Sequence, residues 1–147
     1  MTASHAFAIC AYGQSPYLRE CIESVLNQQD DDGRPVRSEI FIATATPSAW
    51  LDGIASDYEL AVIVNDGGHG IGQDWNFAYS QATADYVTIT HQDDIYCPRY
   101  ASAATSSYIE DNARANEDLE LFRRFWPNPI AKLISRAYSS SEKSNDI

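Results

Sequence analysis

The sequence predicts an α/β domain with a mostly parallel β-sheet and helices on both faces. Two observations carry this prediction. Short apolar runs alternate, along residues 7–90, with stretches whose apolar residues repeat at helical spacing. Each apolar run also ends in glycine or polar residues, as buried strands do where they reach the edge of a sheet. Strands that alternate with helices form a parallel sheet, because each crossover helix packs back on one of its faces.

The first strand and helix are the clearest elements. Residues 7–12 form a continuous apolar run closed by Gly13, which predicts a buried strand. Ser15 and Pro16 match an N-cap followed by proline at the first helical position. An amphipathic helix is predicted over 16–28, because four apolar residues share one face: Leu18, Ile22, Val25 and Leu26.

The next elements repeat the alternation. We expect strands over 39–44, 60–64 and 86–90, a short helix from Pro47 to about residue 56, and a longer helix over 71–84. Trp75 and Phe77 lie at helical positions in the longer helix, where large aromatic residues usually belong to the core.

The pattern changes after residue 98 and suggests three parts. Residues 1–100 form the predicted α/β domain, 101–138 a helical C-terminal extension, and 139–147 a polar, serine-rich tail that we expect to be disordered. The helices expected beyond the change cover 99–112, 115–125 and 130–138.

The charge is strongly negative and unevenly distributed. The net charge is −11, and residues 1–112 carry sixteen acids against four bases. Nucleic acids and anionic lipid surfaces both require clustered Lys and Arg, so we expect neither as a partner. A phosphate-bearing ligand would meet few fixed cations on this domain. It would need a metal ion, main-chain N–H groups, or both.

We expect a cytoplasmic protein without a transmembrane segment. The three cysteines are an odd number and form no C-x-x-C pair, which is typical of reduced thiols. No window approaches the ~20 apolar residues of a membrane span. The first residues, from Met1 to His5, lack the basic and apolar pattern of a secretory signal.

An acidic turn is the strongest candidate site. The strand over 86–90 runs directly into His91, Gln92, Asp93 and Asp94. Adjacent carboxylates at a strand tip suit Mg²⁺ or Mn²⁺, which take oxygen ligands and keep positions open for phosphate. The two aspartates could also be a plain polar turn. His91 could be a ligand, a hydrogen-bond donor to phosphate, or an ordinary strand-end residue.

Other polar positions should lie near this turn. Tyr12, Thr44 and Asn65 each follow or end a predicted strand, and ligands bind beyond the carboxyl ends of parallel strands. The glycine loop over 67–72 could receive an anion on its N–H groups, or could be a flexible loop without a ligand. It does not match G-x-G-x-x-G. Cys10 lies in an apolar strand, so we expect a raised thiol pKa and low reactivity.

Two segments together resemble the family 2 glycosyltransferases, which have the Rossmann-like GT-A fold that binds nucleotide sugars. Residues 8–13 and 17–28 are similar to the first strand and helix of that family. Residues 84–89 followed by 92–96 are similar to its fourth strand and metal-binding D-x-D turn. The resemblance covers residues 6–100.

The resemblance implies transfer of a sugar from a metal-bound nucleoside diphosphate sugar to an unknown saccharide or lipid-linked acceptor, in bacterial surface polysaccharide synthesis. Mn²⁺ or Mg²⁺ is the implied cofactor, with Asp93 as its ligand. The implied donor-binding residues are Cys10, Tyr12, Thr44, Asn76, Gln92 and Asp94. Tyr12 should lie against the nucleobase.

The sequence departs from the family pattern in three places. Thr44 with Ala45 replaces an acidic pair on the second strand, so the base is not identified. His91 with Gln92 replaces the first acid of D-x-D. Only about fifty residues follow the turn, which suggests a truncated member. Asp118 is similar to an acid of the later E-D-x-x-L segment and is the candidate catalytic base, although an ordinary charged helix face explains it equally.

Two alternatives therefore stay open. The chain could be a catalytically incompetent nucleotide-sugar-binding domain that needs a partner chain. It could also be an interaction domain in which Asp93 and Asp94 only form a turn. The sequence does not determine the oligomeric state, and a homo-oligomer is compatible with it.

Overall fold

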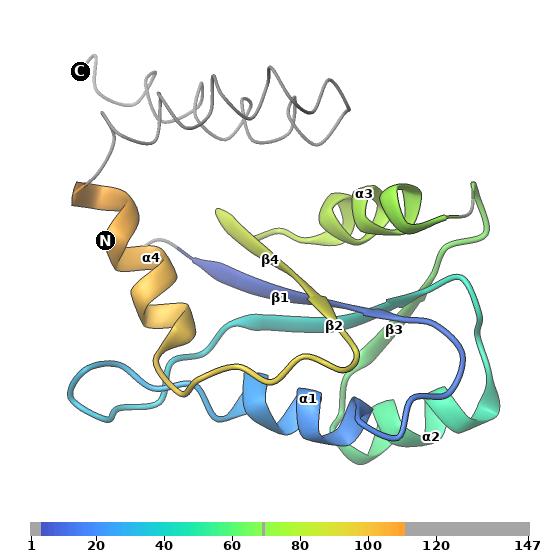
Figure 1. Ribbon diagram of the computed structural model, residues 1–147, viewed down its shortest axis with the longest axis horizontal. Coiled ribbons are helices and arrows are strands. Elements are labelled where there is room, and N and C mark those ends of the chain that lie inside the picture. Colours follow the sequence, from blue (N-terminus) through green and yellow to red (C-terminus); the bar gives the residue numbers. More distant parts are fainter. Residues whose placement is uncertain (1–3, 69, 111–147) are drawn as a thin grey trace. The chain divides into compact units, whose positions relative to one another are not determined.

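Four parallel strands form the centre of the described part of the chain, which in this computed structural model covers residues 4–68 and 70–110. The elements are β1 (His5–Ala11), α1 (Leu18–Leu26), β2 (Glu39–Thr44), α2 (Ala49–Asp57), β3 (Ala61–Val64), α3 (Ile71–Gln81), β4 (Tyr86–His91) and α4 (Tyr100–Glu110). The strand order is β3-β2-β1-β4, and every neighbouring pair is parallel (Figure 1). The predicted fold class is confirmed.

The element bounds differ from the predicted ones mainly at the ends. β2 coincides with the prediction, whereas α1 begins at Leu18 instead of residue 16. The reason is a turn before the helix, in which the Tyr17 N–H donates to the Ser15 hydroxyl at 3.3 Å. Ser15 therefore holds this turn and does not cap the helix. The helices predicted over 115–125 and 130–138 and the tail over 139–147 lie outside the described residues.

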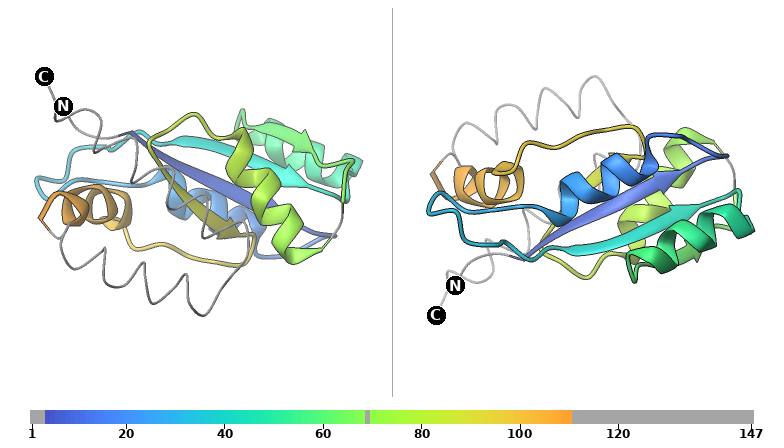
Figure 2. Two further views of the ribbon diagram at one scale, coloured as in Figure 1. Left: turned by 90° about the horizontal axis from the view of Figure 1, so that it is seen from above. Right: turned by 90° about the horizontal axis from the view of Figure 1, so that it is seen from below.

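The two faces of the sheet have separate cores. Side chains alternate along β1, so Phe7 and Ile9 pack with α1 and α2, while Ala8 packs with Ala78 of α3. Figure 2 shows α1 and α2 on one side of the sheet and α3 on the other. The core on the α3 side combines small residues such as Ala8 and Ala43 with the larger Phe41. No helix in the described part of the chain is long and apolar enough to cross a membrane.

A line of three residues on α1 and just after it, which we call the α1 stripe, contacts the chain from the last residue of β4 to the first turn of α4. The α1 stripe consists of Cys21, Ser24 and Gln28. The Cys21 thiol donates to the His91 carbonyl at 3.3 Å, and the Ser24 hydroxyl accepts from the Tyr96 N–H at 3.1 Å. Spacings of three and four residues put all three side chains on one side of the helix. The stripe therefore fixes the chain immediately after β4.

Gln28 is the most extensively bonded member of the stripe. Its side chain is 1% exposed. Its amide nitrogen donates to the carbonyls of Ser24 at 2.9 Å and Cys97 at 3.0 Å, and its amide oxygen accepts from the Ala101 N–H at 2.9 Å. The last of these bonds satisfies an otherwise unpaired donor in the first turn of α4. Gln28 thus connects the end of α1 to the start of α4.

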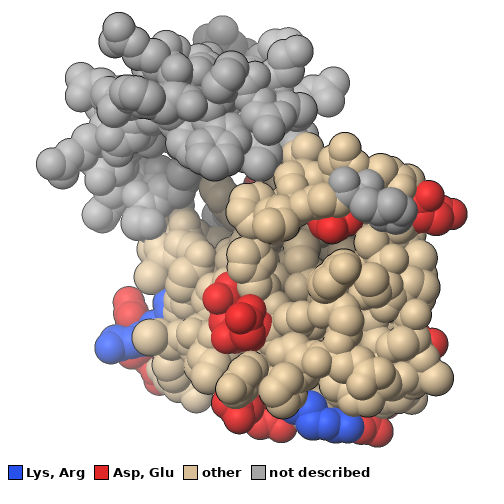
Figure 3. All heavy atoms as spheres, turned by 45° about the vertical axis from the view of Figure 1, so that its right-hand side comes forward, with Lys and Arg blue, Asp and Glu red and all other residues tan. Residues whose placement is uncertain are grey.

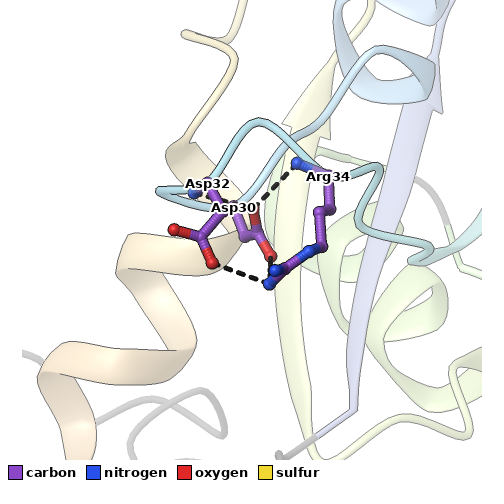
Figure 4. A network of polar contacts seen from close by, with 3 residues as sticks. All are labelled: Asp30, Asp32 and Arg34. Atoms are coloured by element: carbon purple, nitrogen blue, oxygen red, sulfur yellow. Dashed lines mark hydrogen bonds and ion pairs between the residues drawn. The ribbon is translucent and has the colours of Figure 1, made fainter.

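The loop after Gln28 uses its own acidic residues to hold its shape. One carboxylate oxygen of Asp30 accepts from the main-chain N–H groups of Asp32 at 2.9 Å and Arg34 at 2.8 Å (Figure 4). The Arg34 guanidinium in turn contacts Asp32 at 2.7 Å. Gly33 has φ of +76°, a conformation that glycine adopts readily. These carboxylates serve the turn itself.

His5 gives a testable pH dependence of stability. It is 5% exposed, and its ring nitrogens contact the hydroxyls of Ser38 and Thr88, each at 2.9 Å. Burial lowers the pKa of His5 below its ordinary value of 6.5. Below pH 6.5 the unfolded chain therefore binds a proton that the folded chain does not. The contribution of neutral His5 to the free energy of unfolding is fully present above pH 6.5 and is lost as the pH falls toward the pKa of His5 in the folded protein.

The free energy of unfolding from urea titrations should consequently fall between pH 7.5 and pH 5.5. The His5 part of this slope is at most about 1.4 kcal/mol per pH unit, because one proton is involved. The His5→Gln variant keeps a polar side chain that does not titrate, so its slope should be smaller. Equal slopes for the two proteins would contradict the assignment.

Candidate functional site

A cavity of about 880 Å³ opens at the carboxyl edge of the sheet. Its walls come from the ends of β1, β2 and β4, from the residue after β3, and from the first turns of α3. Tyr12, Thr44, Asn65 and Asp93 all line it. The sequence placed these residues at one edge of the sheet because parallel strands end together, and the structure brings them around one cavity.

The predicted donor-binding residues divide into two groups. Those that line the cavity are Cys10, Tyr12, Thr44, Gln92 and the predicted metal ligand Asp93. Asn76 and Asp94 lie outside the lining. The Asn76 side-chain oxygen is buried and has no hydrogen-bond partner within the described part of the chain. Asp118, the candidate base, lies outside the described residues.

Hydroxyl groups, not carboxylates, lie at the tip of β2. The Thr44 hydroxyl accepts from the Thr46 N–H at 3.0 Å and lies 3.4 Å from the Thr46 hydroxyl. The Thr46 hydroxyl also accepts from the Gly13 N–H at 2.8 Å. Both threonines line the cavity. This wall can both donate and accept hydrogen bonds, and it carries no charge.

Residues of α3 form the opposite wall, which corrects one expectation. Trp75 and Phe77 were expected in the core, and Phe77 does pack against the core on this face of the sheet, but both side chains line the cavity together with Asp74. The first turns of α3 reach over the carboxyl edge, so side chains there face the cavity. The Asp74 carboxylate accepts from the Asn65 side-chain amide at 2.9 Å, which ties the helix to the end of β3. Only the position of Asp74 in the first helical turn could have suggested its role.

The glycine loop is tightly folded before α3. The Asn65 side chain accepts from the Gly67 N–H at 3.2 Å and donates to the Gly68 carbonyl at 3.2 Å. A Cβ atom on Gly68 would collide with the side chain of Gln73. Gly70 has φ of +123°, which other residues rarely adopt. Glycine is therefore required at position 70, whereas at position 68 the flexible end of the Gln73 side chain could move aside.

The acidic turn is closed by its own main chain. The His91 N–H donates to the Asp94 carboxylate at 3.0 Å, and the Asp94 N–H donates to the His91 carbonyl at 3.1 Å. The Gln92 amide nitrogen donates to the Tyr12 carbonyl at 2.7 Å, which joins the turn to the end of β1. The other end of this amide, its oxygen, is buried without a partner among the described residues.

Three side chains of this turn have donor atoms close enough for one metal ion. One atom each from His91, Asp93 and Asp94 lies within 4.8 Å of the others. Ligands of a single small cation, each about 2.1 Å from it, lie roughly 3 to 4 Å apart. Small side-chain rotations would therefore bring the three onto one ion. The donor set of two carboxylates and an imidazole fits a divalent cation.

Charge around the cavity is negative. Among the described residues that line it, Asp74 and Asp93 are acidic and none is Lys or Arg. Figure 3 shows red acidic side chains in the middle of one face and blue basic ones only near its lower margins, beside red ones. Arg19 contacts Asp57 at 2.7 Å, outside the cavity lining.

Two thiols, of the half-buried Cys10 and the buried Cys21, are poor nucleophiles. Burial is the main cause, and the nearby Asp74 carboxylate a smaller one, that raises the pKa of Cys10 to about 12. For Cys21, burial is again the main cause, and the negative charges of Asp94 and Asp93 add to it, so that its pKa rises to about 12. Both thiols stay protonated at neutral pH, as the position of Cys10 in an apolar strand predicted.

Comparison with known proteins identifies related sequences and folds. The family model for glycosyl transferase family 2 matches residues 6–139. No curated protein matches the chain.

Solved structures with the same fold include three glycosyltransferase chains. The crystal structure of S. aureus TarS 1-349 has a TM-score of 0.61 and 18% identity, over 74% of this chain and 33% of that one. The same TarS fragment in complex with UDP also has a TM-score of 0.61 and 18% identity, over 74% and 32%. The mannosyltransferase PcManGT from Pyrobaculum calidifontis, in complex with GDP-Man and Mn²⁺, has a TM-score of 0.56 and 15% identity, over 73% of this chain and 32% of that one. The chain thus spans about a third of each, and the likeness is one of fold.

Proposed function

Because the chain belongs to glycosyl transferase family 2, we propose that its cavity binds a nucleoside diphosphate sugar together with Mn²⁺ or Mg²⁺. The observation that carries this proposal is the position of the acidic turn at the mouth of a cavity of nucleotide size. The complexes of TarS with UDP and of PcManGT with GDP-Man and Mn²⁺ support it.

The lining residues suit the parts of such a donor. Tyr12 is 73% exposed and offers its ring for stacking with a nucleobase. The hydroxyls of Thr44 and Thr46 can donate to or accept from the polar edge of that base. Asp93 would hold the cation next to the diphosphate. A bound divalent cation supplies positive charge that offsets the charge of the leaving diphosphate.

The absence of cationic side chains from the described lining makes the metal decisive for diphosphate binding. Without a cation, a diphosphate would meet the carboxylates of Asp74 and Asp93 and be repelled. A nucleoside lacks this charge and should bind the same walls with or without metal.

The test is calorimetry with UDP, GDP, uridine and guanosine, each with Mn²⁺ and after removal of metal by EDTA. We expect Mn²⁺ to strengthen diphosphate binding at least about tenfold, or roughly 1.4 kcal/mol, and to leave nucleoside binding unchanged. Diphosphate binding of equal strength with and without metal would rule out the proposed arrangement. The preferred base in this screen also identifies the donor class.

Sugar transfer is the second part of the proposal. The acceptor would be a saccharide or a lipid-linked saccharide in bacterial surface polysaccharide synthesis, with the donor site in the cytoplasm and Asp118 as base. A domain that only binds the donor would show metal-dependent calorimetry without release of nucleoside diphosphate from nucleotide sugars. Steady release in the presence of Mn²⁺ would support the transferase.

A further inference from the structure

We propose that the imidazole of His91 is a direct ligand of the cation, so that the centre is a mixed nitrogen and oxygen site that prefers Mn²⁺ and later transition-metal ions to Mg²⁺. The inference rests on the proposed function only in placing a cation at this turn. Its first support is proximity, because a ring nitrogen of His91 lies within 4.8 Å of carboxylate oxygens of both Asp93 and Asp94.

The His91 ring is held in place from a second element. It stacks on the Trp75 ring of α3, with 5.3 Å between ring centroids and 30° between planes. Both side chains line the cavity. Trp75 therefore restricts rotation of the imidazole, while the exposed edge of the imidazole stays accessible. A ligand restrained in this way loses less conformational entropy when it binds an ion.

The main chain of His91 is equally restrained. Its N–H donates to the Asp94 carboxylate, and its carbonyl accepts from the Asp94 N–H and from the Cys21 thiol. His91 also pairs with Cys10 of β1 at the end of the parallel ladder. These contacts place its Cα at a defined point of the sheet edge, so the ring projects from a rigid strand and not from a mobile loop.

The chemistry of the donor atoms sets the metal preference. Asp94 already uses one carboxylate oxygen, Oδ2, to accept from the His91 N–H at 3.0 Å and from the Tyr96 hydroxyl at 3.4 Å. The protein would thus offer two carboxylates, one of them partly engaged, and one imidazole. Mg²⁺ requires near-ideal octahedral oxygen ligation, whereas affinity of nitrogen-containing sites rises from Mn²⁺ toward the later divalent ions. The imidazole therefore favours the transition metals over Mg²⁺.

Spectroscopy on the full chain with Mn²⁺ alone tests the ligand directly. A nitrogen bound to Mn²⁺ gives a ¹⁴N modulation in the electron spin echo of the ion. We expect this modulation in the native protein and its loss in His91→Gln, which keeps a polar side chain of similar reach. The other histidines are unchanged in the variant, so the loss would assign the signal to His91. A native protein without ¹⁴N modulation, or a variant that retains it, would overturn the inference.

Metal titrations give an independent readout. The native protein should bind Mn²⁺ at least about tenfold more tightly than Mg²⁺, and His91→Asp should narrow this ratio by tightening Mg²⁺ binding. An unchanged ratio in His91→Asp would also overturn the inference. If nitrogen coupling is found but nucleoside diphosphates bind without regard to metal, the proposed function fails and the ligand assignment stands. If metal-dependent diphosphate binding occurs without nitrogen coupling, the proposed function stands and the ligand assignment fails.

Discussion

Replacing Asp93 with asparagine is expected to weaken Mn²⁺-dependent binding of a nucleoside diphosphate at least about 100-fold. Removing a residue that only hydrogen-bonds to a metal ligand lowers metal affinity by up to about 100-fold, and removing the ligand itself should cost at least as much. The substitution keeps the shape of the side chain and removes its charge. The effect should be large because no Lys or Arg among the described lining residues could hold the diphosphate in place of the cation. Calorimetry at saturating Mn²⁺ measures it.

Two comparisons make this result specific. The Asp52→Asn variant removes the same charge from an exposed position on α2, outside the cavity lining, and should bind like the native protein. Binding of the free nucleoside should be the same in Asp93→Asn as in the native protein, because the base-binding wall is unaltered. Equal diphosphate affinity of Asp93→Asn and the native protein would show that the cation is held elsewhere.

Replacing Gln28 with alanine should lower the free energy of unfolding by about 3 kcal/mol. The substitution removes three hydrogen bonds and leaves the Ala101 N–H without its partner. An unsatisfied buried group costs about 1–3 kcal/mol, and the lost side-chain volume adds a cavity. Urea unfolding followed by circular dichroism measures the change.

The neighbouring residue provides a matched control. Gln29 is exposed, and its main-chain N–H donates to the Pro98 carbonyl at 2.7 Å. Gln29→Ala keeps this main-chain bond and should change stability by less than about 0.5 kcal/mol. Similar losses for the two variants would mean that the side-chain network of Gln28 contributes little.

The sequence predicted the sheet well because its strands are short, apolar and bounded by turn residues. β2 matches the predicted range, and β4 extends one residue beyond it to His91. The same regularity located the edge at which Tyr12 and Asp93 both lie, since parallel strands end on one side. The cavity followed from topology and did not require knowledge of any contact.

The side chains of α3 could not be placed in this way. Whether Trp75 faces the core or the cavity depends on where the helix begins relative to the sheet edge, and the glycine loop with Gly70 at positive φ decides that. The burial of Gln28 was equally hidden, because glutamine is mostly exposed in folded proteins. Its partners lie 69 and 73 residues further along the chain, beyond the reach of local periodicity.

These long separations also affect how the protein is made on the ribosome. Gln28 of the α1 stripe bonds to Cys97 and Ala101, and β1 pairs with β4. Residues synthesised early can therefore make these contacts only after the later residues have been synthesised. At 5–20 residues per second, about seventy residues take roughly 4 to 14 s to synthesise. The pairing of β1 takes slightly longer, because its partners on β4 lie 81 residues later, as His5 and Tyr86 do, and until then one edge of β1 has no partner strand. Nascent chains released before Ala101 would lack these closing bonds.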